Sequence, residues 1–133
     1  MKYFLDTDSC LCFLKGTSTK FLENIRQRNP DDIKIPSLVK AELCHAAERS
    51  AERQKNLELV ARFLLPLEIV DFNDAAAAVY ARIRSKLKDN GKTSGAHTLL
   101  IAATVLASRG VLVTDNRKEY GKIADLKMEN WLA

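Results

Sequence analysis

Short apolar runs alternate with longer helix-forming segments along this chain. Each run is too short to be a helix and is bounded by turn residues or by helical periodicity, which predicts buried strands. Strands that alternate with helices form a mainly parallel sheet covered on both faces, so we expect an α/β domain. The predicted strands are residues 3–5, 33–35, 67–72 and 111–113, with a last edge strand at 127–131.

The segments between these runs carry apolar residues at spacings of three and four, as amphipathic helices do. Ser37 and Asp74 are expected to be N-caps, Pro66 to end a helix, and Gly110 to terminate the last long one. The predicted helices are residues 10–14, 18–28, 37–49, 51–65, 74–88 and 96–108.

Length and composition limit the class of protein. The 133 residues are enough for one domain, so we expect a single domain over 1–133. The net charge of +4 suits a nucleic-acid partner without requiring one. Three cysteines without a CxxC pair argue against a disulfide framework and a zinc site. No apolar run resembles a signal peptide or a membrane span, so we expect a soluble cytoplasmic protein.

Acidic residues follow two of the predicted strands. Asp6 and Asp8 come after the first strand, and Asp115 follows the strand at 111–113. Functional sites in parallel α/β sheets form at the carboxyl ends of the strands, where these acids are expected to lie. Asp is also a common N-cap, so capping the next helix is the alternative interpretation of each.

A glutamate interrupts the apolar stripe of the helix predicted to begin at Ser37. A buried glutamate is rare unless it is paired or binds a metal, because removing the charge from water is costly. We therefore expect this side chain to point toward the acids at the strand ends, with a position at the stripe edge, reaching water, as the alternative. The stripe consists of Val39, Glu42, Leu43 and Ala46.

Converging carboxylates repel one another unless a cation lies between them. Oxygen-only ligands favour Mg²⁺ or Mn²⁺ over zinc. Such an ion activates water and stabilises the negative charge that develops in phosphoryl chemistry. The acids thus point to metal-dependent phosphoryl chemistry.

Five segments of the chain together resemble the bacterial PIN-domain VapC toxins. The resemblance covers essentially the whole chain and implies a PIN-like three-layer sandwich. It also implies an Mg²⁺-dependent endoribonuclease that cuts structured RNA, is usually a homodimer, and is neutralised by a VapB-type antitoxin. The segments are FLDTD, PSLVKAEL, GAHTLLIAA, GVLVTDN and LKMENW.

The resemblance assigns roles to individual residues. Asp6 matches the first metal-binding aspartate, Glu42 the glutamate of the AEL motif, and Asp115 the acid or amide of the last cluster. Thr114 and Asn116 are supporting polar neighbours, and Asp8 either joins the cluster or caps a helix. Arg84, with Lys86 and Lys92, is a candidate guide for RNA phosphates, although a solvated helix face is the simpler interpretation.

Thr98 is the departure from the family pattern. The family usually has a metal-binding aspartate at this position, and a neutral hydroxyl is a poor substitute for it. We therefore expect reduced activity, in a chain that is either a deliberately disabled toxin or a natural variant. Neighbouring His97 is expected to be a surface or capping residue, with a metal ligand or a catalytic base as the alternative.

Two other functions compete with this one. Asp6-Thr7-Asp8 matches the DxD opening of haloacid dehalogenase phosphatases, but Cys10 and the lack of a second acid close behind Asp115 disfavour that class. The second alternative is a catalytically dead PIN-fold module that sequesters the antitoxin. Binding of this kind survives without metal if a basic side chain of the antitoxin satisfies the carboxylates.

Overall fold

Five short strands form one all-parallel sheet in the order β3-β2-β1-β4-β5 in the computed structural model, which describes residues 1–132. The first strand lies at the centre and pairs with β2 on one side and β4 on the other. The α/β architecture with a parallel sheet is therefore confirmed. The strands are β1 (Tyr3–Leu5), β2 (Ile33–Pro36), β3 (Glu68–Val70), β4 (Val111–Val113) and β5 (Met128–Glu129).

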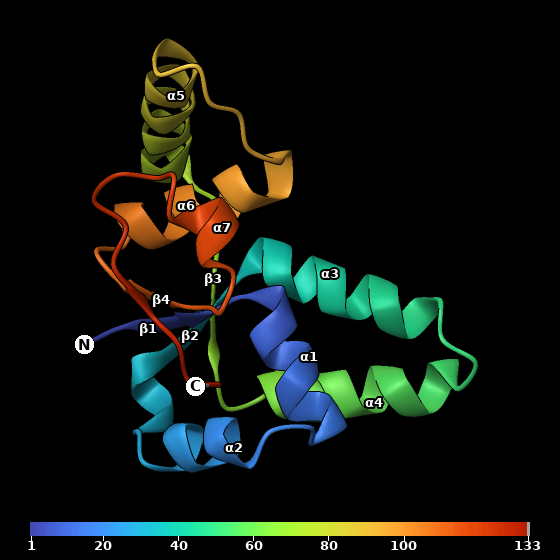
Figure 1. The fold of residues 1–133 in the computed structure, drawn as a ribbon. Helices are drawn as coiled ribbons and strands as arrows, with labels where there is room; N and C mark the ends of the chain where they lie inside the picture. The colour runs from blue at the N-terminus through green and yellow to red at the C-terminus, as the bar shows by residue number, and fades with distance from the viewer. Residues whose placement is uncertain (133) are drawn as a thin grey trace.

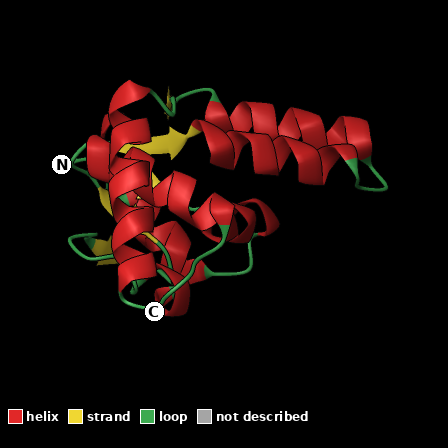
Figure 2. Cartoon of the chain, turned by 90° about the horizontal axis from the view of Figure 1, so that it is seen from above, coloured by secondary structure: helices red, strands yellow, loops and turns green. Residues whose placement is uncertain are grey.

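Helices cover both faces of the sheet (Figure 1). In that view α5, α6 and α7 lie above the strands and α1, α2 and α4 lie below them. The pair α3 and α4 runs side by side away from the sheet and forms a projecting arm, which Figure 2 shows from above. The helices are α1 (Thr7–Lys15), α2 (Thr19–Arg26), α3 (Ser37–Glu48), α4 (Arg53–Leu64), α5 (Asp74–Asp89), α6 (Ala96–Ala107) and α7 (Arg117–Tyr120), with a 3₁₀ turn at Pro30–Asp32.

The predicted strands and helices are all found, but several ends differ and the short helix α7 was not predicted. The strand predicted at 67–72 is limited to Glu68–Val70, and the edge strand predicted at 127–131 to Met128–Glu129. Both lie at the edges of the sheet, where pairing on one side only supports fewer residues. The first helix is longer than the predicted 10–14 and begins directly after Asp6.

The two predicted N-caps are wrong by one residue. Ser37 is the first helical residue of α3, and the N-cap is Pro36, which offers no side-chain acceptor. In α5 the cap is Asn73, whose Oδ1 accepts a hydrogen bond of 3.0 Å from the backbone N–H of Ala76. Asp74 is instead an acidic residue in the first turn, where its charge suits the helix dipole.

The end of α6 also differs from the prediction. The chain leaves the helix through Arg109, which has the left-handed φ of 57°, and not through Gly110. Gly110 is needed for space: a Cβ there would lie 2.5 Å from Cδ1 of the Phe4 ring. The missing side chain thus lets the start of β4 lie against a buried ring of β1.

An aromatic cluster closes the core beside β1. Trp131, 2% exposed, packs with ring centroids 5.3 Å from Tyr3 and 5.9 Å from Phe21. The guanidinium carbon of Arg28 lies 4.3 Å from the centroid of the Trp131 ring and 5.1 Å from that of Tyr3. The cluster joins the C-terminal segment to β1 and α2. None of the helices formed by residues 1–132 has the length and apolar character to cross a membrane.

Candidate active site

A solvent-open pocket of about 160 Å³ lies at the carboxyl end of β1. Its walls come from the start of α1, the middle of α3, the first turn of α6 and the segment after β4. These elements meet because every strand is parallel, so that all the strands end at the same edge of the sheet. The lining residues are Asp6, Thr7, Asp8, Glu42, His97, Thr98, Ile101, Asn116 and Tyr120.

Asp6 is both a helix cap and a wall of the pocket. It is 3% exposed, and its Oδ1 accepts a hydrogen bond of 2.9 Å from the backbone N–H of Ser9, which caps α1. Its Oδ2 accepts a hydrogen bond of 2.5 Å from the hydroxyl of Thr114, at the end of β4. The two interpretations of Asp6 from sequence are therefore compatible, because capping uses one oxygen and leaves the carboxylate in the pocket wall.

The pKa of Asp6 is raised from its ordinary value, chiefly because burial disfavours the ionised form. Hydrogen bonds from Ser9 and Thr114 oppose this rise, and the nearby charge of Asp8 adds to it. A neighbouring positive charge would stabilise the ionised form of such a buried carboxylate. Asp8 is itself exposed, in the first turn of α1, and lines the same pocket.

Glu42 lies at the edge of the buried face of α3, with a side chain 29% exposed. Its Oε1 accepts a hydrogen bond of 2.8 Å from the hydroxyl of Thr7, and its Oε2 lies 3.3 Å from Nδ1 of His97. The structure therefore places Glu42 in the same pocket as Asp6. The predicted stripe is wrong in one member, because Ala47 is buried and Ala46 is exposed.

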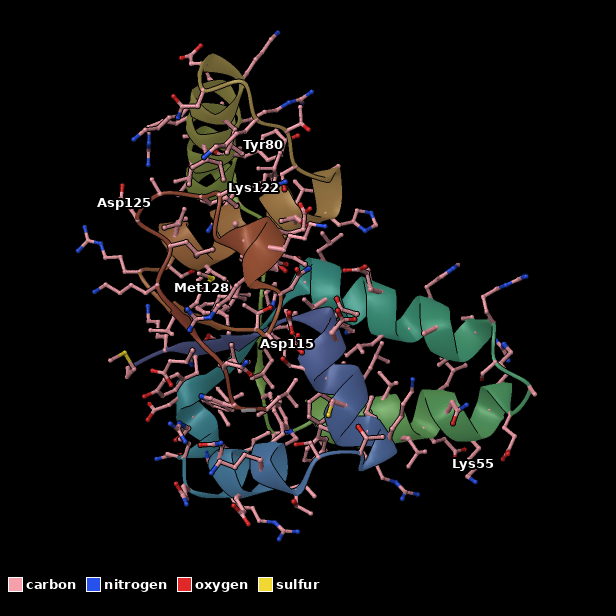
Figure 3. All side chains as sticks on the ribbon, viewed as in Figure 1. Lys55, Tyr80, Asp115, Lys122, Asp125 and Met128 are labelled. Atoms are coloured by element: carbon pink, nitrogen blue, oxygen red, sulfur yellow. The ribbon has the colours of Figure 1, made fainter. Side chains whose placement is uncertain are left out.

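The structure does not bring Asp115 into this pocket. Asp115 is exposed, in the turn between β4 and α7 where Figure 3 labels it, and it is absent from the pocket lining. The next residue, Asn116, lines the pocket, and its backbone N–H donates to the Thr114 hydroxyl over 3.0 Å. The turn that follows β4 thus brings Asn116, and not Asp115, into the lining of the pocket that contains Asp6.

Thr98 lies where the sequence resemblance requires it, in the first turn of α6 and in the pocket lining. Within the described residues the Thr98 hydroxyl has no recorded hydrogen bond. Arg84 is outside this pocket: it is exposed on α5 and donates a hydrogen bond of 3.1 Å to the Tyr80 hydroxyl.

The pocket offers carboxylate, hydroxyl and amide oxygens, the donor types that a hard divalent cation prefers. The residues present thus suit such an ion in donor type. They are sparse in number: across residues 1–132 no three His, Cys, Asp or Glu side chains form a group that could hold a metal ion. Two carboxylates, Asp6 and Glu42, are held in place by hydrogen bonds, while the expected third position is Thr98.

The sequence analysis missed two polar lining residues, Thr7 and Tyr120, and the apolar Ile101. The Thr7 hydroxyl donates a hydrogen bond that positions Glu42. Thr7 directly follows Asp6 at the start of α1, and this position in the sequence could have indicated a residue of the site. Tyr120 is 4% exposed and reaches the pocket from α7. Burial, with the negative charges of Asp6 and Glu42, raises its pKa. Nothing in the local sequence pattern distinguishes Tyr120 from an ordinary core aromatic.

A family model described as the PIN domain matches residues 3–126. Ribonuclease VapC2 of Rickettsia felis is 33% identical over 132 residues, which are 98% of each chain. The tRNA(fMet)-specific endonuclease VapC of Salmonella typhimurium is 33% identical over 135 residues, again 98% of each chain. The solved structure of DNA-bound VapBC from Salmonella typhimurium superposes with a TM-score of 0.93 at 30% identity, covering 98% of each chain.

The fold is thus that of a PIN-domain protein. The chain belongs to the PIN-domain family and, at this identity over nearly its full length, to the VapC group within it. This membership confirms the resemblance found in the sequence motifs and excludes the phosphatase alternative.

Proposed function

We propose that this chain is the toxin of a toxin–antitoxin pair and an endoribonuclease that uses Mg²⁺ or Mn²⁺ in the pocket at the end of β1. The ribonuclease and endonuclease names of its relatives support the activity. The observation that carries the proposal is the meeting of Asp6 and Glu42, 36 positions apart in the sequence, in one pocket.

The chain's own residues orient these carboxylates. Ser9 and Thr114 fix both oxygens of Asp6, while Thr7 and His97 hold those of Glu42. Asp6 and Glu42 would hold the ion, with the side-chain oxygens of Thr98 and Asn116 beside them, and exposed Asp8 adds negative charge to the pocket lining. A bound divalent ion activates water and stabilises the charge that develops on the phosphate. The open side of the pocket leaves room for an RNA backbone to approach.

Glu42→Gln tests the metal site. It keeps the size of the side chain and removes one negative charge, so we expect the affinity for Mn²⁺ and the rate of RNA cleavage each to fall at least tenfold. Glu48→Gln is the matched control, since Glu48 is on the same helix but is exposed and paired with Arg53. Calorimetric titration with Mn²⁺ measures binding, and gel analysis of a labelled transfer RNA measures cleavage. Equal behaviour of the two variants would show that the pocket is not the metal site.

A second function, capture of a VapB-type antitoxin, is favoured by one observation. A threonine, not a carboxylate, occupies position 98 of the pocket. The similar solved structure from Salmonella typhimurium is described as VapBC. Binding of an antitoxin needs only the remaining carboxylates, which accept charge-assisted hydrogen bonds from Arg or Lys. We propose that this partner occupies the pocket whether or not the chain cleaves RNA.

Glu42→Ala is expected to weaken binding of the antitoxin as well as of metal. Loss of a charge-assisted hydrogen bond in a half-buried site costs about 1.5–3 kcal/mol, or more than tenfold in Kd. Surface plasmon resonance with the immobilised antitoxin measures this. An unchanged Kd, with metal binding lost, would mean that the antitoxin does not use the carboxylate pocket.

A further inference from the structure

The net positive charge of the chain is concentrated in one segment. The whole sequence has 21 Lys and Arg against 17 Asp and Glu. Residues 82–92 contain five of these bases and one of the acids, so the remaining 122 residues carry 16 of each and have no net charge. The basic character of the protein is therefore local, at the C-terminal half of α5 and the turn after it.

The five bases are exposed and are not neutralised by the described part of the chain. All of them are exposed to solvent, and none takes part in an ion pair with another described residue. Arg84 is steadied by Tyr80, which accepts its hydrogen bond and lies under its guanidinium at 5.9 Å. The bases are Arg82, Arg84, Lys86, Lys88 and Lys92.

Three of these bases surround a hollow of about 310 Å³ beside the start of α6. We call Arg84, Lys88 and Lys92 the basic surface; the first two lie one helical turn apart on α5. Thr93, Ser94 and Leu99 complete the hollow together with Leu87. In Figure 1 the loop after α5 descends from the far end of that helix to α6 and so joins the two elements.

The loop that borders the hollow is held in place by two hydrogen bonds. The Ser94 hydroxyl donates to Oε2 of Glu119 over 3.1 Å, and Nζ of Lys122 donates to the carbonyl of Thr93 over 3.2 Å. Only three residues farther along the chain, His97 and Thr98 line the carboxylate pocket. Leu99 lines the hollow and Thr98 the pocket, so the first turn of α6 separates two adjacent depressions of opposite charge.

We infer that the basic surface binds the phosphates of the RNA strand whose neighbouring phosphodiester enters the carboxylate pocket. This inference rests on the proposed ribonuclease function. Asp6, Asp8 and Glu42 repel an RNA backbone, so a pocket of this charge needs cations nearby to hold its substrate. Exposed Lys and Arg side chains, together with Ser and Thr hydroxyls, are groups that contact phosphate and sugar in nucleic-acid complexes.

An acidic protein is the other polyanion that such a surface attracts. Stable protein interfaces have an apolar core enriched in aromatic side chains. The hollow offers only Leu87 and Leu99, both buried, and no aromatic residue lines it. The lining of charged and hydroxyl groups therefore favours RNA over a protein partner.

The triple variant Arg84→Gln, Lys88→Gln, Lys92→Gln tests the inference. Fluorescence anisotropy with a fluorescein-labelled transfer RNA, without divalent metal, measures binding apart from cleavage. We expect Kd to rise at least tenfold at 150 mM salt. Single-stranded contacts contribute about 0.7 each to the slope of log K against log salt, so the slope should shrink by roughly 2.

The control triple variant is Lys20→Gln, Arg49→Gln, Lys55→Gln, which removes the same charge from exposed positions on α2 and the projecting arm. It should change Kd by less than twofold. An equal loss of RNA affinity in both triple variants would mean that only net charge matters, and it would overturn the inference. Unchanged RNA affinity in both variants would overturn it too. If labelled polyglutamate binds as tightly as RNA, and the triple variant of the basic surface loses affinity for both, the surface would be assigned to an acidic protein.

Cleavage by the Thr98→Asp chain with Mg²⁺ separates this inference from the proposed function. If that chain cuts RNA and the basic surface proves irrelevant to Kd, the ribonuclease assignment stands and the inference falls. If the basic surface controls Kd but no chain cuts RNA with metal, RNA binding stands and the proposed catalytic function falls.

Discussion

Replacing Thr98 by aspartate is expected to raise the affinity for Mn²⁺ and the rate of RNA cleavage at least tenfold each. The residue lines the pocket beside Asp6 and Glu42, and the structure records no hydrogen bond of its hydroxyl within the described chain. The change therefore breaks no recorded contact. It also places a negative charge in the first turn of α6, where the helix dipole favours it.

The size of this effect follows from the charge of the site. A tenfold gain in affinity needs about 1.4 kcal/mol. Two unit charges 4 Å apart near a protein surface interact with about 4 kcal/mol, and the ion carries two charges. Removing water from the new carboxylate and from the ion offsets part of this gain. The expected tenfold increase requires that about 1.4 kcal/mol of the attraction remains.

Thr98→Asn is the matched control, because it has the shape of aspartate and a ligand oxygen but no charge. Calorimetry with Mn²⁺ and gel analysis of labelled transfer RNA should rank the aspartate variant far above both the asparagine variant and the unchanged chain. Equal rates in all three would refute the idea that Thr98 limits the site. Binding by none of them would make antitoxin capture the leading function.

Trp131→Ala is expected to lower the free energy of unfolding by about 3–5 kcal/mol, the range for truncating a buried aromatic residue. The indole is 2% exposed and packs on Tyr3 and Phe21. It also lies under the guanidinium of Arg28, whose Nε is buried and has no hydrogen-bond partner among the described residues. Its removal therefore opens a cavity and leaves a partly buried cation with only Tyr3 as an aromatic neighbour.

Urea unfolding followed by circular dichroism measures this loss without relying on fluorescence, since Trp131 is the only tryptophan. Leu65→Ala is the control, because Leu65 is 85% exposed and should change stability by less than about 0.5 kcal/mol. Similar midpoints for the two variants would mean that the C-terminal segment does not contribute to the core.

The inner strands β1 and β4 were predictable because they are largely buried and are therefore short, wholly apolar runs in the sequence. Residues 3–5 and 111–113 are found as strands at their predicted positions. The edge strands were overestimated, since hydrophobic sequence continues past the point where a pairing neighbour is present. The two N-caps were misplaced because Ser37 and Asp74, which are residue types that often cap helices, each follow the actual cap by one position. The actual caps are Pro36 and Asn73.

The site was predictable to the level of elements but not of every side chain. Parallel strands ending at one edge were enough to bring Asp6 and Glu42 together. Which of Asp115 and Asn116 faces the pocket depends on the turn that Thr114 begins, and no periodicity encodes that direction. Hydrogen-bond partners such as Thr7 depend on distances across 35 positions of sequence, which spacing alone does not give.

The central place of β1 has a consequence for the newly made chain. Domains generally fold as units, and the first 70 residues already contain β1, β2 and β3 as neighbours. The hydroxyl that holds Asp6, however, belongs to Thr114, 108 positions later. Synthesis must therefore pass residue 114 before the last wall of the pocket can form, however early the first three strands are made.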